Sequence, residues 1–464
     1  MLQALGKLFS QRLQQWMPEP FVFAIVLTLL AALFAVLYTD TGLVGTLDSW
    51  YRGFWMLLEF GMQMVLMLAT GYAIALSPAV SRVIDKLALL VRTPESVYVM
   101  VIVVGALFTL VSWGWAVVTA VLARELAKRV EGLDYPFLVA CVYLSSQPWV
   151  GGLSSSIPLL LGTENNFLME MGILGSTIGV SHTLGSVLNL LYLLAFFLGI
   201  PLLMWLMRPK GDDVQSLQEL GDGLYQHQGT VKEEAESYSQ SGRTLSDRLN
   251  NGLLLQWLVA LAALAVVFRH FVSRGQGLDL NIMIFIFIAV GLFLHVTPMR
   301  FAVAMKRACS NISGIVFQYP FYAGIMGIMM YSGLGEMVSA WMASHATVST
   351  LPIIAQLSGA LINFAIPSAG GEWAVIGPAF TEAAKSVAAQ LPPDQLEPFI
   401  GRVAMSVAYG ESSTNLLQPF FILVILPVMG AGVRIQARDV MGYLVLPFLY
   451  LTLVIALLVS LTPL

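Results

Sequence analysis

Long apolar runs alternate with short polar stretches along the whole chain. A helix needs roughly 20 mainly apolar residues to cross a bilayer. The runs predict uninterrupted spans at residues 21–38, 54–76, 253–268, 282–294, 312–331 and 443–461. Other apolar units, at residues 96–123, 137–161, 172–207, 351–384 and 403–428, are interrupted by Gly, Pro, Ser or Trp. The pattern therefore predicts a bundle of complete and broken membrane helices.

The interruption at residues 363–378 carries an Asn, a Ser, a Glu, two prolines and three glycines. Pro removes a backbone donor, and Gly and Ser weaken a helix. Unpaired backbone at membrane depth is tolerated only where it is buried in protein or lines a watery cavity. We therefore expect a re-entrant hairpin tip that builds a binding site. A second break is predicted at residues 409–419, and weaker counterparts lie at residues 113–115 and 145–156.

Composition narrows the class of protein. The chain has 464 residues, of which 58% are hydrophobic and 11% charged, whereas soluble domains carry about 25% charged residues. The apolar runs are continuous, which argues against the alternating strands of a membrane β-barrel. The two cysteines, Cys141 and Cys309, lie in or beside apolar segments without metal-ligand spacing. The sequence has no basic patch with interleaved aromatics, which would indicate nucleic-acid binding. It also has no nucleotide-binding loop, which would indicate transport driven by ATP.

One long polar segment, residues 208–250, divides the chain. It is rich in Gly, Ser, Gln, Asp and Glu and has few aliphatic residues, so we expect a linker. The predicted organisation is an N-terminal membrane repeat at 1–207, a cytoplasmic linker at 208–250 and a C-terminal membrane repeat at 251–464. Residues 1–19 are expected to form a short amphipathic lead-in.

The two halves resemble each other. The segment from Trp115 to Val118 matches that from Trp373 to Ile376, and Gln63 matches Gln318 at similar distances before them. Suppose that both Trp-containing units are re-entrant and that the N-terminus is cytoplasmic. Then 18 Lys and Arg residues lie on the cytoplasmic side and five on the outside. If both units crossed the membrane fully, nine would lie inside and 14 outside. The positive-inside rule favours the hairpins. This topology is an inverted repeat, a common plan of secondary transporters.

Several motifs together resemble those of the bacterial short-chain fatty acid transporter family, within the ion-transporter superfamily. They lie at residues 55–71, 123–136, 321–325, 332–335, 363–371, 408–411 and 438–443, and thus cover nearly the whole chain apart from the linker. The resemblance implies uptake of acetate-to-butyrate-sized acids or acetoacetate through the inner membrane. It also implies inverted repeats with hairpins and elevator-like motion, and a homodimer is expected by analogy.

A carboxylate inside the membrane must keep hydrogen bonds or a counter-charge. The predicted spans contain no Lys or Arg clear of their ends, so backbone amides at half-helix N-termini, hydroxyls and side-chain amides are the expected donors. The candidates for substrate binding are Ser368, Gly370, Gly371, Ser412, Ser413, Thr414, Asn415, Ser154, Ser155 and Ser156. Trp373 is a candidate for lining an apolar pocket. Close helix packing is the competing interpretation of such small residues.

Glu411 and Glu372 are the acids deep in the second-half breaks. An intramembrane carboxylate costs roughly 2.5–3.5 kcal/mol on insertion scales. Glu411 either carries a coupling proton or cation, or hydrogen-bonds backbone freed at the break. Asn363 either orients the hairpin or coordinates Na⁺, and the predicted Na⁺ position is near Asn363 and Asn415. His182 could sense pH, or it is simply hydrogen-bonded.

The leading hypothesis is secondary active uptake of short-chain monocarboxylates, coupled to H⁺ or Na⁺, without a further cofactor. The nearest rival is a di- or tricarboxylate:cation symporter, which the lack of buried basic residues disfavours. An intramembrane serine hydrolase is disfavoured because no Gly-x-Ser-x-Gly elbow is present. A channel is the third alternative. The protein is therefore expected to be a multi-pass inner-membrane transporter, with the lipid bilayer and a small monocarboxylate as its partners.

Overall fold

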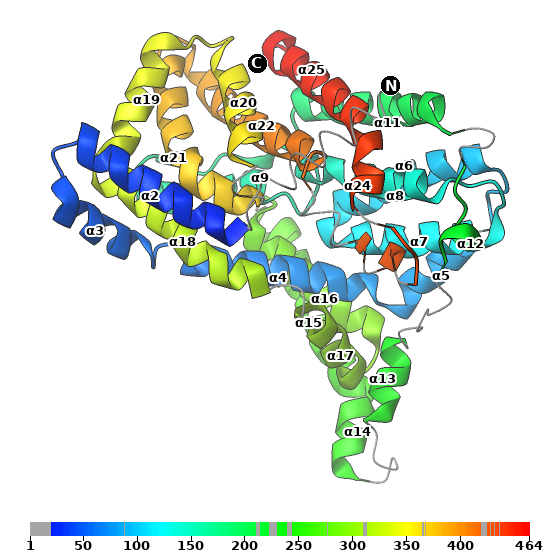
Figure 1. Ribbon diagram of the computed structural model, residues 1–464. Helices are drawn as coiled ribbons and strands as arrows, with labels where there is room; N and C mark the ends of the chain where they lie inside the picture. Colours follow the sequence, from blue (N-terminus) through cyan, green and yellow to red (C-terminus); the bar gives the residue numbers. More distant parts are fainter. Residues whose placement is uncertain are drawn as a thin grey trace.

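The computed structural model describes residues 20–464, except for residues 88, 210–213, 222–229, 239–243, 276, 310–312, 364–365, 367, 419–424, 427, 431 and 436. The predicted lead-in at residues 1–19 lies outside this part. Helices dominate throughout the described ranges (Figure 1). The first half contains α2 (Pro20–Tyr38), α3 (Gly42–Gly53), α4 (Leu58–Ala75), α5 (Pro78–Leu87), α6 (Pro94–Val111), η1 (Trp113–Trp115), α7 (Ala116–Arg129), α8 (Tyr135–Ser145), η2 (Gln147–Gly151), α9 (Ser156–Leu161), α10 (Phe167–Glu170), η3 (Val180–His182) and α11 (Val187–Met207).

The remainder is also helical. It contains α12 (Leu217–Leu220), α13 (Val231–Ser237), α14 (Leu245–Asn251), α15 (Leu253–Phe268), a π-helical turn η5 (Arg269–Ser273), α16 (Leu280–His295), α17 (Pro298–Cys309), α18 (Ser313–Tyr331), α19 (Leu334–His345), α20 (Leu351–Ile362), α21 (Ala369–Ala388), η6 (Pro393–Gln395), α22 (Leu396–Asn415), α24 (Ala437–Met441), η7 (Gly442–Leu444) and α25 (Val445–Leu461). Five stretches of the described chain are long and apolar enough to cross a membrane: Leu58–Ala75, Pro94–Val111, Val187–Met207, Leu245–Ser273 and Asp439–Leu461. The all-α polytopic fold class predicted from the sequence is confirmed.

The predicted uninterrupted spans all appear as helices, but other parts of the chain differ from the prediction. Helices α3, α17 and α19 were not predicted, because they are short and carry polar residues. The apolar stretch at 172–207 was predicted as a span interrupted near residue 181, but only Val187–Met207 forms a regular α-helix. Gly172, Gly175, Gly179 and Gly185 interrupt the preceding segment, which is mostly irregular.

One part of the molecule packs α2 and α3 against α18, and α4 against α16 and α17. Gly53 of α3 and Gly327 of α18 allow the first of these close approaches: a Cβ added at Gly53 would lie 2.4 Å from the Gly327 Cα atom. Small residues let membrane helices approach at backbone distance. We call α2, α3, α4, α15, α16, α17 and α18 the outer group.

Each half also contains a hairpin followed by a helix that runs parallel to its first arm. In the first half, Tyr98 of α6 accepts a hydrogen bond from the Asp134 backbone, and Thr109 donates to the Ser145 carbonyl at 2.9 Å. The start of α6 lies beside the end of the hairpin, since a Cβ at Gly132 would contact Pro94. In the second half, α20 and α21 form the hairpin, and α20 packs along α22.

The segment predicted as a linker contains short helices that pack on the outer group. Val231 and Ala235 of α13 are buried against α17. Arg307 of α17 pairs with Glu234 at 2.6 Å. Figure 1 shows α13 and α14 beside α15 and α17 on an arm that projects from the rest of the molecule. Parts of residues 208–250 are therefore docked helices, although their polar composition limits how much they bury.

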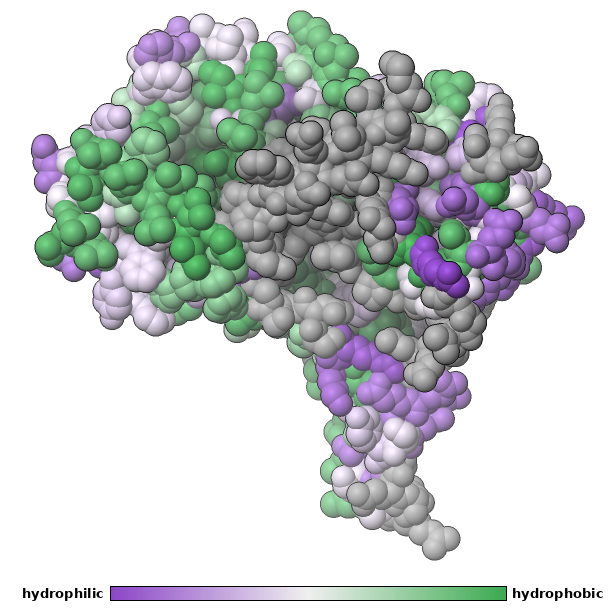
Figure 2. Space-filling view, viewed as in Figure 1, coloured by the Kyte–Doolittle hydropathy of each residue, from purple (hydrophilic) through white to green (hydrophobic). Residues whose placement is uncertain are grey.

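Hydrophobic and hydrophilic surfaces are separated. Figure 2 shows mostly hydrophobic residues over the side of the molecule that carries α2, and hydrophilic residues around α13. Leu29, Leu33 and Leu37 of α2 are each more than half exposed, as is Leu254 of α15. In a soluble protein such leucine faces would be unfavourable, whereas lipid accommodates them. The surface thus agrees with a multi-pass membrane protein.

Candidate functional site

Three helix ends meet where the second hairpin turns. Asn363 caps the C-terminus of α20, and its amide donates to the Glu411 carbonyl at 2.9 Å and to Asn415 Oδ1 at 2.7 Å. Glu411 and Asn415 lie in the last turns of α22. The third end is the N-terminus of α21, which begins directly after the tip. We call this region the hairpin junction.

The N-terminus of α21 is capped by Ser368. Its hydroxyl accepts a hydrogen bond from the Gly371 amide at 3.4 Å and lies 3.3 Å from the Tyr319 hydroxyl of α18. Gly370 lies closely against the same tyrosine, because an added Cβ would be 2.6 Å from its hydroxyl oxygen and 2.9 Å from Phe60 Cζ. The first amides of a helix point outward and carry the positive end of its dipole. This end therefore has anion-binding chemistry, between the hairpin and the outer group.

The second predicted break begins later than expected. The sequence placed it at residues 409–419, but α22 is continuous through Asn415, and its helical backbone ends only there. The hydroxyls of Ser413 and Thr414 donate to the carbonyl of Gly410, at 2.9 and 3.1 Å, within the same helix. The described junction thus places Ser413 and Thr414 at the C-terminal, negative end of a helix dipole. Pro419, expected to break the helix, lies outside the described residues.

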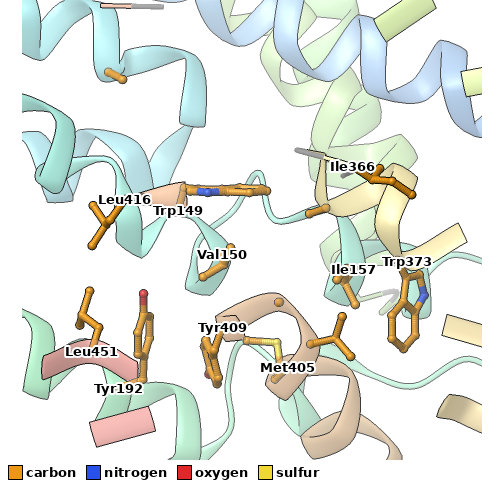
Figure 3. Close-up of a cluster of buried hydrophobic side chains, with 14 of the residues drawn as sticks. Trp149, Val150, Ile157, Tyr192, Ile366, Trp373, Met405, Tyr409, Leu416 and Leu451 are labelled. Atoms are coloured by element: carbon orange, nitrogen blue, oxygen red, sulfur yellow. The ribbon is translucent and has the colours of Figure 1, made fainter. Parts of the chain in front are cut away.

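The end of α22 also joins the two halves of the chain. Ser412 donates to the Gln147 carbonyl of η2 at 2.7 Å, and the Tyr143 hydroxyl of α8 donates to the Asn415 carbonyl. Tyr409 donates to Asn189 Oδ1 of α11 at 3.0 Å. Figure 3 shows Val150 and Ile157 of the first half beside α22, which carries Tyr409. The break at residues 145–156 and the end of α22 therefore lie together.

The first-half serines occupy buried positions next to the first hairpin. The Ser154 hydroxyl accepts a hydrogen bond from the Trp113 amide at 2.9 Å, so the tip of this hairpin contacts the break that precedes α9. Ser155 is the residue before α9, and its side chain makes no capping bond to that helix. Ser156 is the first residue of α9 and is buried as well.

Glu372 and Glu411 are both completely buried in the hairpin junction. Glu372 lies in the first turn of α21, and a Cβ added at Gly359 of α20 would be 3.1 Å from its Oε1 atom. The two carboxyl groups are close enough to interact electrostatically. Among the residues that the structure describes, neither carboxyl makes a hydrogen bond of normal geometry, and the Asn415 side chain lies beside Glu411. Asn363 Oδ1 and Gln418 Oε1 also lack such a bond there.

The junction contains residues that the sequence did not single out. Tyr319 touches Ser368 and interacts electrostatically with Glu411, so it lies between the two helix ends. Gln418 donates from Nε2 to the Asn363 carbonyl. Gln418 belongs to the predicted break, and Tyr319 follows Gln318, which was noted in the repeat. Neither position could be assigned to the junction before the helices were placed in space.

Trp373 is 1% exposed and faces the core beside α22, where Figure 3 draws it near Ile157. His182 is distant in the sequence and lies at the other end of α22, where its Nε2 atom is 3.6 Å from a carboxyl oxygen of Glu397. Both side chains are partly exposed. Trp373 is therefore a core residue beside the hairpin junction, while His182 forms a separate surface pair.

The two hairpins, the interrupted helices and the apolar spans define a polytopic α-helical membrane protein. The solved Alcanivorax borkumensis YdaH transporter, whose topology is described as unusual, is similar in fold: the TM-score is 0.53 at 17% identity, over 96% of this chain and 98% of that one. Neisseria gonorrhoeae MtrF, described within a class of antimetabolite efflux pumps, gives a TM-score of 0.55 at 15% identity, over 98% and 97% of the two chains.

Sequence comparison then gives the family. The model of the short chain fatty acid transporter family matches residues 1–462. An Escherichia coli K12 protein with the provisional name short-chain fatty acid transporter is 34% identical over 97% of both chains. A Haemophilus influenzae protein with the same provisional name is 32% identical over 96% of both chains. The chain belongs to the short-chain fatty acid transporter family, as its motifs indicated.

Proposed function

We propose that this protein takes up short-chain monocarboxylates, of acetate-to-butyrate size or acetoacetate, across the bacterial inner membrane by secondary active transport. The observation that carries the proposal is the match to the transporter family over residues 1–462. The coupling ion is H⁺ or Na⁺, no other cofactor takes part, and the N-terminus lies in the cytoplasm. Two inverted repeats and a homodimer complete the proposed arrangement.

The substrate carboxylate binds at the N-terminus of α21 in this proposal. The outward-pointing amides of Ala369 and Gly370 supply the positive end of a 20-residue helix, and the hydroxyls of Ser368 and Tyr319 supply further donors. A desolvated carboxylate needs such compensation. Lys385, the basic residue of this helix, is near its far end and donates to the Ile173 carbonyl. A single carboxylate can thus be held without a cationic side chain.

Aromatic side chains limit the size of the substrate. Phe60 and Tyr319 form an edge-to-face pair with ring centroids 5.9 Å apart beside Gly370, and Tyr322 lies against Gly371. These rings offer an apolar surface to a short alkyl chain. A second carboxylate in the same place would lack hydrogen bonds, at a cost far above what a small ligand recovers. We therefore favour a monocarboxylate over a di- or tricarboxylate.

Uptake into proteoliposomes tests the proposal. Labelled butyrate, acetoacetate and succinate are compared under separate H⁺ and Na⁺ gradients. We expect saturable uptake of the two monocarboxylates, driven by one of the gradients, and little uptake of succinate. Preference for succinate would support the dicarboxylate alternative, and uptake that neither saturates nor responds to a gradient would support a channel.

Tyr319→Phe tests the carboxylate position. The variant removes one hydroxyl beside Ser368, and a hydrogen bond to a charged group contributes about 1.5–3 kcal/mol, so KM for butyrate should rise roughly tenfold or more. Tyr331→Phe is the matched control on α18, because the Tyr331 hydroxyl contacts the Met56 sulfur instead. Equal KM values in the two variants would remove Tyr319 from the site.

A further inference from the structure

The hairpin junction contains more buried acceptors than donors. Glu372 and Glu411 contribute both carboxyl oxygens, and Asn363 and Gln418 each contribute one amide oxygen. None of these atoms makes a hydrogen bond of normal geometry in the described part of the chain, and the Asn415 side chain lies beside Glu411. The four residues that carry these atoms are fully buried, at 0% exposure. Buried polar atoms are nearly always hydrogen-bonded, so such a cluster needs an explanation.

The two amides are oriented so that they cannot supply the missing donors. Asn363 uses its Nδ2 group on the Glu411 carbonyl and on Asn415 Oδ1. Gln418 uses its Nε2 group on the Asn363 carbonyl. Rotating the Asn363 amide by 180° would turn its oxygen toward two other oxygens. Among the described residues, the Asn415 side chain lies within reach of Glu411, and a proton on a carboxyl group would add a further donor to the cluster.

No basic side chain of α21 or α22 is placed to neutralise the two carboxyl groups. Arg402 of α22 donates to the Pro463 carbonyl, and Lys385 of α21 to the Ile173 carbonyl, so both basic groups of these helices are engaged elsewhere. The ionisable groups that α18 and α11 direct toward Glu411 are the phenols of Tyr319 and Tyr192. Helix α20 has no ionisable side chain.

Tyr322 of α18 packs against Gly371, next to Glu372, and its hydroxyl donates to Gln318 Oε1. Three further ionisable groups on elements packed against α21 and α22 have partners outside the pair. His182 faces Glu397, the Tyr450 hydroxyl of α25 donates to the Ala195 carbonyl, and His345 contacts Trp341 and Ser344 of α19. Two ionised carboxylates in such surroundings would cost several kcal/mol each, and one bound Na⁺ would neutralise only one of them. A proton on one of the two carboxyl groups would remove much of this cost, with or without a metal ion.

We propose that Glu372 and Glu411 form a single proton-carrying pair, supported by the amide oxygens of Asn363 and Gln418, and that this pair couples transport to H⁺. The inference rests on the proposed function. Tyr319 connects the pair to the substrate position. Its hydroxyl lies next to the Ser368 hydroxyl, and it is close enough to Glu411 to interact with it electrostatically. A proton that enters the pair removes one negative charge from the neighbourhood in which the substrate carboxylate binds. Proton uptake thus favours substrate binding, and substrate release favours proton release.

Two transport assays separate coupling from substrate handling. Uptake driven by a pH gradient requires the pair, whereas counterflow of labelled against unlabelled butyrate requires only substrate binding and exchange. Glu372→Gln and Glu411→Gln should each reduce stimulation by the pH gradient by at least about tenfold, within the usual range of coupling free energies, and should reduce counterflow much less. Glu397→Gln is the matched control on α22, since this partly exposed residue pairs with His182 outside the junction; it should change neither assay.

Infrared difference spectra provide a readout that does not depend on transport. The wild-type protein should show a protonated-carboxyl C=O band that decreases with rising pH, and Glu411→Gln and Glu372→Gln should each remove part of it, while Glu397→Gln leaves it intact. A pH-independent spectrum, or uptake driven by Na⁺ alone with normal counterflow in both variants, would overturn the pair while leaving fatty acid transport intact. Absence of wild-type counterflow with all tested monocarboxylates would instead overturn the proposed function.

Discussion

Asn363 and Asn415 are hydrogen-bonded to each other, with Nδ2 of the first 2.7 Å from Oδ1 of the second. This bond joins the C-termini of α20 and α22, which run parallel: a Cβ at Gly359 would contact the Val407 carbonyl, and four residues further on Asn363 reaches the Glu411 carbonyl. Thr109 makes the equivalent connection in the first half, by donating to the Ser145 carbonyl. Each hairpin is thus attached to the end of the helix that follows it.

Replacing Asn363 with Ala should destabilise the second hairpin. The Glu411 carbonyl would lose a donor, and Asn415 Oδ1 would become a buried unpaired acceptor, each costing about 1–3 kcal/mol. The melting temperature of purified Asn363→Ala protein should therefore fall, together with uptake. Asn250→Ala is the control, because Asn250 lies on the docked helix α14 and makes an exposed hydrogen bond. Equal melting temperatures of Asn363→Ala and wild type would show that this connection does not hold the hairpin.

Neighbouring serines on α22 should differ in their effect on transport. Ser412 donates across the two halves to Gln147, whereas Ser413 donates to Gly410 in its own helix. Ser412→Ala should slow uptake several-fold, because it leaves the Gln147 carbonyl buried without that donor, and Ser413→Ala should have a smaller effect. Uptake rates normalised to reconstituted protein give the comparison. A larger loss in Ser413→Ala would indicate that its hydroxyl leaves Gly410 during transport and contacts the substrate.

Gly370 should not tolerate even one additional methyl group. The Cβ of Gly370→Ala would lie 2.6 Å from the Tyr319 hydroxyl and 2.9 Å from Phe60, so one of these side chains must move. Overpacking of this kind costs about 1–3 kcal/mol. Since both side chains border the proposed carboxylate position, KM for butyrate should rise. Gly175→Ala is the control, because no atom lies within 4 Å of the added Cβ. Unchanged KM in Gly370→Ala would move the substrate away from this helix end.

The crossing of α3 and α18 should require a small residue at Gly53. A Cβ there would lie 2.4 Å from the Gly327 Cα atom and 2.6 Å from the Ala323 carbonyl oxygen, which are backbone atoms that no rotamer change can displace. Gly53→Leu should therefore reduce the yield and the melting temperature of folded protein. Gly277→Leu, at a position where the added Cβ meets nothing within 4 Å, controls for the larger side chain. Comparable melting temperatures for the two variants would contradict the close crossing.

Much of the fold could be predicted from the sequence because lipid imposes strict limits on it. A segment such as Val187–Met207 has to be a helix, since hydrocarbon leaves the backbone no other way to satisfy its hydrogen bonds. The turn at Trp113–Trp115 and the tip before Ala369 were predicted for the same reason, because Gly and Pro interrupt apolar runs only where the backbone has other partners. Short helices such as α17 carry no comparable signal.

The sequence by itself determined the membrane class, the family and where the hairpin breaks begin, because length, apolarity and helix-breaking residues are local properties. The break predicted at residues 363–378 is shorter than expected, since α21 is helical from Ala369 and contains Pro378. Only the tertiary structure decided what lies at those breaks. It extended α22 to Asn415, which turns a negative helix end toward the junction, and it placed Tyr319 and Gln418 beside residues far away in the chain. It also brought Glu372 and Glu411 together from separate helices. The packing of α20, α21 and α22 sets these relationships, and no local pattern along the chain encodes them.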